Sequence, residues 1–170
     1  MVDVLETADA WIYDMDTHFI RNEDDVRTFM EEPYRGRERL LAKGEWYLQA
    51  GRGVQERAPA DLEGCLRRVR DEGVAYALNF PDGAMNLNLI RDKQYLAAYC
   101  RAYNSFAADF AGQSNALGAM AVLPFDNVPA AVEEVNRAIT QLGMAGVFLS
   151  LRVASVLDGI HGHEIRAASF

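Results

Sequence analysis

The tripeptide Asp16-Thr17-His18 is the part of this sequence best suited to chemistry. It follows an apolar run from Ala10 to Tyr13, which predicts a short strand with a polar tip. Residues two apart on a strand point to the same face, so the Asp16 carboxylate and the His18 imidazole should converge beyond the strand's carboxyl end. Zn²⁺ and similar divalent metals accept both donor types, and further ligands would have to come from elsewhere. The alternative interpretation is a solvated strand end.

Other reactive side chains have less structural support in the sequence. His161 and His163 share the same spacing but lie in an aperiodic segment, so we expect an exposed, flexible pair without the rigid support that a site requires. Cys65 falls on an apolar helical stripe and Cys100 beside Tyr99, which predicts buried packing thiols rather than nucleophiles. The motifs of dinucleotide-binding, P-loop and serine-elbow sites are missing from the sequence.

The net charge of −8 comes from one end of the chain. Residues 1–34 hold ten carboxylates against Arg21 and Arg27, and the remaining sequence is balanced. Binding to phosphate depends on Lys and Arg, so nucleic acid and anionic membranes are poor partners. The acidic run is interpreted as a solvated face, with cation binding by one or two of its carboxylates as the alternative.

Cysteine content and apolar runs favour a soluble protein of a reducing compartment. The two cysteines do not form a CxxC pair, and the N-terminal sequence lacks the pattern of a signal peptide. The longest apolar run, 116–125, is too short for a membrane-spanning helix. We therefore expect a cytoplasmic protein without a membrane anchor.

Helical and strand patterns alternate after residue 58. Apolar spacing predicts helices from Pro59 to about 72, over about 89–111, and from Val128 to Leu142, with strands over 74–80, 117–123 and 145–149. The expected apolar stripes are Leu62, Cys65, Leu66 and Val69 in the first helix, Leu96, Tyr99, Tyr103, Phe106 and Phe110 in the second, and Val128, Val132, Val135, Ile139 and Leu142 in the third.

This order predicts an α/β domain over residues 1–150, built from parallel strands joined by right-handed crossovers. Residues 19–58 are expected to form a long covering loop with one or two short helices, and residues 151–170 a weakly structured tail. Periodicity leaves two architectures open, namely a doubly wound sheet and the first half of a TIM-type (β/α)₈ barrel.

Several segments, taken together in order, resemble the amidohydrolase-related family. They are the strand ending in Asp14-Met15-Asp16-Thr17-His18, the long loop after it, Asn79-Phe80-Pro81-Asp82-Gly83, Cys100-Arg101-Ala102-Tyr103-Asn104, Val122-Leu123-Pro124, Arg137-Ala138, and Leu142-Gly143-Met144-Ala145-Gly146-Val147. The resemblance covers about residues 11–150. It favours the first half of a (β/α)₈ barrel, truncated after about four strands.

The resemblance implies a metal-dependent hydrolase or non-oxidative carboxy-lyase acting on a small carboxylate or amide-type substrate. It implies a divalent metal, often zinc, with Asp16 and His18 as its first-strand ligands. The family's later ligands, histidines of the fifth and sixth strands and an acid of the eighth, have no counterpart here, so the active site is expected to be incomplete.

Two classes of function follow from this expectation. One is an enzyme of this family whose missing half is lost or supplied by another polypeptide; the other is a non-catalytic α/β module or dimer with a vestigial metal site. A half-barrel also exposes unpaired strand edges and the inner face of its sheet, so a homo-oligomer or an aggregation-prone chain is expected.

Overall fold

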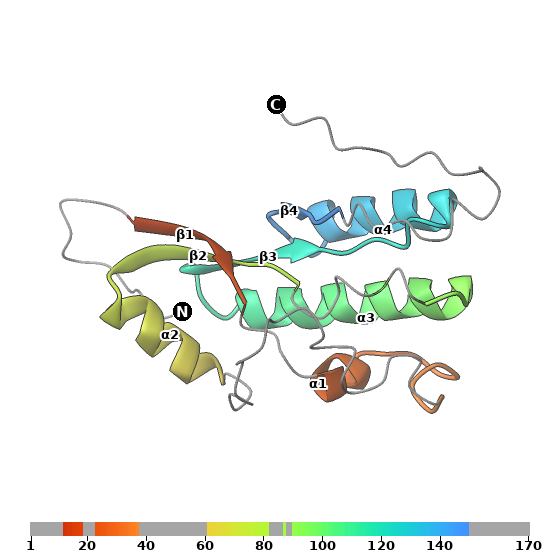
Figure 1. The fold of residues 1–170 in the computed structure, drawn as a ribbon, viewed down its shortest axis with the longest axis horizontal. Helices are drawn as coiled ribbons and strands as arrows, with labels where there is room; N and C mark the ends of the chain where they lie inside the picture. The colour runs from red at the N-terminus through yellow and green to blue at the C-terminus, as the bar shows by residue number, and fades with distance from the viewer. Residues whose placement is uncertain (1–11, 19–22, 38–60, 82–86, 88–89, 150–170) are drawn as a thin grey trace, which may run out of the picture.

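The computed structural model describes residues 12–18, 23–37, 61–81, 87 and 90–149 (Figure 1). Its strands are β1 (Ile12–Thr17), β2 (Val74–Asn79), β3 (Leu117–Ala121) and β4 (Gly146–Val147). Its helices are α1 (Glu23–Thr28), α2 (Leu62–Asp71), α3 (Lys93–Ala111) and α4 (Val128–Thr140). The expected tail over 151–170 and residues 19–22 and 38–58 of the expected loop lie outside the described residues.

The four strands are parallel and lie side by side in chain order, β1-β2-β3-β4. A doubly wound sheet reverses its strand order at the point where ligands bind, whereas a (β/α)₈ barrel adds each strand on the same side of the previous one. The uninterrupted order therefore decides between the two predicted architectures. The described residues form the first half of a TIM-type barrel, as predicted.

Helix boundaries follow local capping groups. Asp61, Asp92 and Asn127 cap the N-termini of α2, α3 and α4, each accepting a hydrogen bond from a backbone N–H of the first turn. Asp92 explains why α3 begins later than the predicted residue 89. Gly73, with φ of 68°, follows α2, where a left-handed conformation suits glycine. In the described part of the chain, no helix is both long and apolar enough to cross a bilayer.

The hydrophobic core lies between the sheet and α3. Cys65, Leu66 and Val69 of α2 are buried, as predicted. Tyr95, Tyr99 and Tyr103 of α3 are each 1% exposed, the rings of Tyr95 and Tyr99 lie 6.3 Å apart, and α3 packs against β3. α1 contacts α3 from the side away from the sheet (Figure 1). Its Val26 is fully buried, so part of the expected covering loop belongs to the core.

The expected apolar stripe of α4 is wrong for three of its five residues, whereas Leu142, just after the helix, packs against the core and Val135 is half-buried. Val128, Val132 and Ile139 are 68%, 55% and 44% exposed, whereas Glu134 and Ala138 are buried. The described half-barrel provides the reason: among the described residues β4 is a short edge strand, and no further strand lies beside it to cover this side of α4. The predicted helix is confirmed, but its buried face carries a carboxylate.

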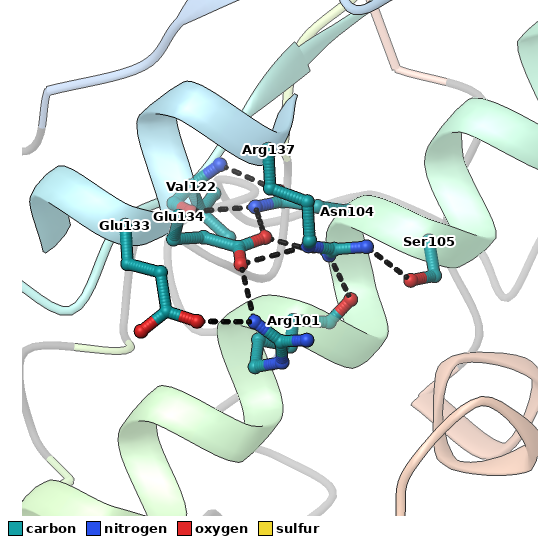
Figure 2. A network of polar contacts seen from close by, with 7 residues as sticks. All are labelled: Arg101, Asn104, Ser105, Val122, Glu133, Glu134 and Arg137. Carbon is teal, nitrogen blue, oxygen red and sulfur yellow. Dashed lines mark hydrogen bonds and ion pairs between the residues drawn. The ribbon is translucent and has the colours of Figure 1, made fainter. Parts of the chain in front are cut away.

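That carboxylate belongs to a polar network that joins α3, α4 and the end of β3 (Figure 2). Asn104 donates to Val122 O at 2.9 Å and to Glu134 Oε1 at 2.8 Å, and it accepts from Val122 N at 2.8 Å. Arg137 donates to both Glu134 oxygens at 2.7 and 2.9 Å. Arg101 adds a longer contact of 3.4 Å to Glu134 Oε2. The network fixes the chain where it leaves β3.

Candidate metal site at the carboxyl edge of the sheet

Asp16 and His18 lie side by side at the carboxyl end of β1. Asp16 Oδ1 is 3.4 Å from His18 Nε2, and the two side chains are 82% and 33% exposed. Asp14 Oδ1 accepts a hydrogen bond of 3.1 Å from the Asp16 backbone N–H, which shapes the end of the strand. The predicted convergence of one carboxylate and one imidazole is therefore present in the structure.

Strand pairing extends to the carboxyl edge beside Asp16 and His18. Thr17 pairs with Asn79 of β2, and both side chains are buried, at 4% and 2% exposure. Phe80 N donates to Thr17 O at 2.7 Å, so the two strand ends remain paired to the edge. The β1–β2 register shifts between Asp14 and Thr17, which marks an irregularity in the part of the strand that contains Asp16.

Two aromatic residues lie at the same carboxyl edge of the sheet. Phe80 directly follows Asn79, the residue that pairs with Thr17. Its ring is 6.1 Å from that of Phe148, edge to face, so the ends of β2 and β4 approach each other. One edge of the sheet thus carries both the polar pair Asp16 and His18 and the apolar rings of Phe80 and Phe148.

Further from the edge, Tyr76 of β2 crosses over β3. A Cβ atom at Gly118 would lie 1.8 Å from the Tyr76 hydroxyl, so glycine is required where the ring passes. Burial raises the pKa of Tyr76 further above the ordinary pH range, so its phenol adds no charge to this part of the sheet.

Asp16 and His18 carry the types of donor atom that a divalent metal binds, but two donors are too few for a complete metal shell. Carboxylate oxygen and imidazole nitrogen are both zinc ligands, and tetrahedral bonds of about 2.0 Å separate neighbouring donor atoms by about 3.3 Å. The observed 3.4 Å matches that spacing. Within the described ranges, however, no group of three or more His, Cys, Asp or Glu side chains is placed to hold a metal. The described residues thus offer two candidate ligands, Asp16 and His18.

The remaining candidate groups have structural roles or lie elsewhere. Cys65 and Cys100 are buried free thiols, as predicted. Burial, followed by the negative charges of Glu134 and Asp126, raises the pKa of Cys100 well above its usual value, so its thiolate is disfavoured. The Glu134 carboxylate accepts hydrogen bonds from Arg137 and Asn104 between α3 and α4. The two tail histidines, His161 and His163, lie outside the described residues.

Two features of the structure were not expected from the sequence. The pairing of Phe80 with Phe148 depends on the curl of the sheet, which joins residues far apart in the chain. The buried Asn104–Glu134 bond has a weak sequence signal, because an amide and a carboxylate interrupt helices that are otherwise rich in apolar residues.

Comparisons with known proteins give one informative likeness. No protein-family model matches the chain, and no curated protein matches it. Among solved structures, the chain is similar to 2,6-dihydroxybenzoate decarboxylase, determined in complex with 2,6-dihydroxybenzoate, with a TM-score of 0.55 and 20% sequence identity. The match covers 81% of this chain and 38% of the decarboxylase chain. At this identity the likeness supports the half-barrel fold.

Proposed function

We propose that this chain is part of a metal-dependent carboxy-lyase or hydrolase of the amidohydrolase-related type, acting on a small, planar carboxylate. The observation that carries the proposal is the Asp16–His18 pair, which stands at the carboxyl edge of the strands with donors 3.4 Å apart. Barrel enzymes place their active sites at this edge. The likeness to a decarboxylase of aromatic acids supports the same class.

The residues of this chain would contribute binding and orientation. The edge-to-face rings of Phe80 and Phe148 offer an apolar surface against which an aromatic ring can pack. Asp16 and His18 would hold a divalent metal, whose positive charge attracts a substrate carboxylate when it is bound. A metal shell with three or four protein ligands and a group that moves protons must both be completed by residues beyond those described.

The alternative is a non-catalytic α/β module with a vestigial site. It is favoured by the shortage of metal ligands in the described residues and by the small share of the decarboxylase that this chain spans. In this case Asp16 and His18 would make only an exposed ion pair, and the rings of Phe80 and Phe148 would only pack against each other.

Ligand binding distinguishes the two functions. Zinc and 2,6-dihydroxybenzoate are added to the purified chain, and binding of the acid is followed by its own fluorescence. We expect binding that requires zinc, is lost in His18→Ala and is weakened several-fold in Phe148→Ala. Asp109→Ala, which removes an exposed carboxylate from α3, is the matched control and should bind normally. Zinc-independent binding, or none, would favour the non-catalytic module.

A further inference from the structure

Strand β1 carries a bulge close to its carboxyl end. Asp14 pairs with Ala77 of β2 and Thr17 pairs with Asn79, so three steps along β1 match two steps along β2. One residue of β1 is therefore extra between these two pairs, which is the mark of a β-bulge. Asp16 lies in this bulge. Bulges are common next to active sites, where they redirect a side chain.

The backbone of the bulge is bound by a side chain of the same strand. The Asp16 N–H donates a hydrogen bond of 3.1 Å to Asp14 Oδ1. An aspartate side chain that accepts from the backbone N–H two residues later makes an Asx-type turn, which bends the chain locally. The Asp14 carboxylate thus supports the irregular backbone at Asp16.

Asp14 and Asp16 have different partners. Asp14 is half-buried, and its Oδ1 binds the Asp16 N–H, whereas the Asp16 side chain is 82% exposed and its Oδ1 lies 3.4 Å from His18 Nε2. Thr17 is buried, and its carbonyl accepts from Phe80 N. Asp14 and Thr17 therefore hold the Asp16 backbone from both sides. An exposed side chain keeps a defined position only when the groups around it are held in this way.

We propose that Asp14 is a positioning residue of the candidate site, whose carboxylate binds the Asp16 N–H and thereby holds the Asp16 carboxylate beside His18. The inference rests on the proposed function for the use of the Asp16–His18 pair, and it adds a residue that acts through Asp16. Because a backbone N–H needs only an acceptor, this role requires an oxygen at residue 14 and not a negative charge.

Nuclear magnetic resonance of the full chain without added metal tests the positioning directly. In Asp14→Ala, exchange of the Asp16 amide hydrogen should be about five-fold faster, as expected for the loss of one hydrogen bond. Asp14→Asn keeps an acceptor oxygen and should exchange like the parent protein. Asp109→Ala, which removes an exposed carboxylate from α3, is the control and should also behave like the parent.

The imidazole signals of His18 test whether Asp14 acts through Asp16. At constant pH, Asp14→Ala should move these signals in the same direction as Asp16→Ala, because both changes remove the Asp16 carboxylate from its place beside the ring. In the Asp16→Ala background, Asp14→Ala should cause no further movement, since residues that act through one another are not additive. An equal movement in both backgrounds would show that Asp14 acts on His18 by another route.

Zinc affinity, measured by calorimetry, connects the positioning to the proposed function. Asp14→Ala should weaken zinc binding about ten-fold, as loss of a supporting group commonly does, and Asp14→Asn should restore it. Weak binding in Asp14→Asn would overturn the proposal, because the charge of Asp14 would then be what matters. Unchanged Asp16 exchange in Asp14→Ala would overturn it as well. A parent protein that binds no zinc but shows the expected exchange and His18 signals would sink the proposed function alone.

Discussion

Asn104 of α3 donates a 2.8 Å hydrogen bond to Glu134 of α4, and both side chains are almost completely buried. The same amide bonds both backbone groups of Val122, directly after β3. One side chain therefore ties two helices to the strand end that leads to the carboxyl edge. The cost of burying the Glu134 carboxylate is offset by its two bonds to Arg137.

Glu134→Ala should lower the free energy of unfolding by about 3–5 kcal/mol, because it leaves the partly buried Arg137 guanidinium and the Asn104 amide without their acceptor. Urea denaturation measures the loss. Glu133→Ala is the matched control. Its carboxylate is 77% exposed and contacts Arg101 at 3.5 Å, so a loss of about 0–1 kcal/mol is expected. Equal losses in the two variants would contradict the structural role given to Glu134.

Asn127→Ala should lower the unfolding free energy by about 1 kcal/mol, because Ala130 N loses the side-chain acceptor that caps α4. Asn127→Asp, which keeps an acceptor at the cap, should retain most of the stability. Thermal unfolding followed by circular dichroism provides the comparison. If Asn127→Asp lost as much unfolding free energy as Asn127→Ala, the loss of stability would not be due to the missing N-cap.

Asp92 predicts a loss of stability in acid. Hydrogen bonds, first from Tyr95 N and then from the Arg37 side chain, hold the pKa of Asp92 below its ordinary value of 3.8. A depressed folded-state pKa means that the unfolded chain takes up the proton first as pH falls. Its contribution is therefore complete above the ordinary pKa and is lost as pH falls through the lower folded value.

The melting temperature of Asp92→Asn, measured across acid pH, provides the check. Asparagine keeps an N-cap acceptor but does not titrate. The difference in melting temperature between the parent protein and Asp92→Asn should shrink as pH falls below about 4. A difference that stays constant through this range would mean that the carboxylate charge of Asp92 contributes nothing.

Cys100 should resist alkylation in the folded protein, because its thiol is fully buried and its pKa is raised. Iodoacetamide at pH 8 should label Cys100 only after urea unfolding, as read by peptide mass spectrometry. Asn115→Cys places a thiol at an exposed position and should react at once. Labelling of Cys100 at the same rate as this exposed thiol would contradict the described packing of α3.

The sequence predicted the elements well because their local signals agree. Apolar spacing at Cys65, Leu66 and Val69 and the glycine at Gly73 place α2 closely. Proximity of Asp16 and His18 followed from the two-residue period of a strand alone. These features depend on neighbours in the chain, which a single sequence displays directly.

The predicted core stripe of α4 failed at three of its five residues because the burial of a helix face depends on what surrounds it. Val128, Val132 and Ile139 have the spacing of a core stripe, but the described sheet ends at β4 and leaves them exposed. Burial of Glu134 depends on Asn104, which is thirty residues away. Contacts of this range are set by the fold, and no local pattern encodes them.

Metal binding by Asp16 and His18 is tested most directly by a cobalt(II) titration, because Co²⁺ replaces zinc in mixed oxygen and nitrogen sites and its visible absorption reports its coordination. We expect strong bands typical of tetrahedral coordination, present in the parent protein and in Asp109→Ala, and lost in both Asp16→Ala and His18→Ala. Bands that persist unchanged in His18→Ala would contradict the claim that the Asp16–His18 pair is the metal site of this chain.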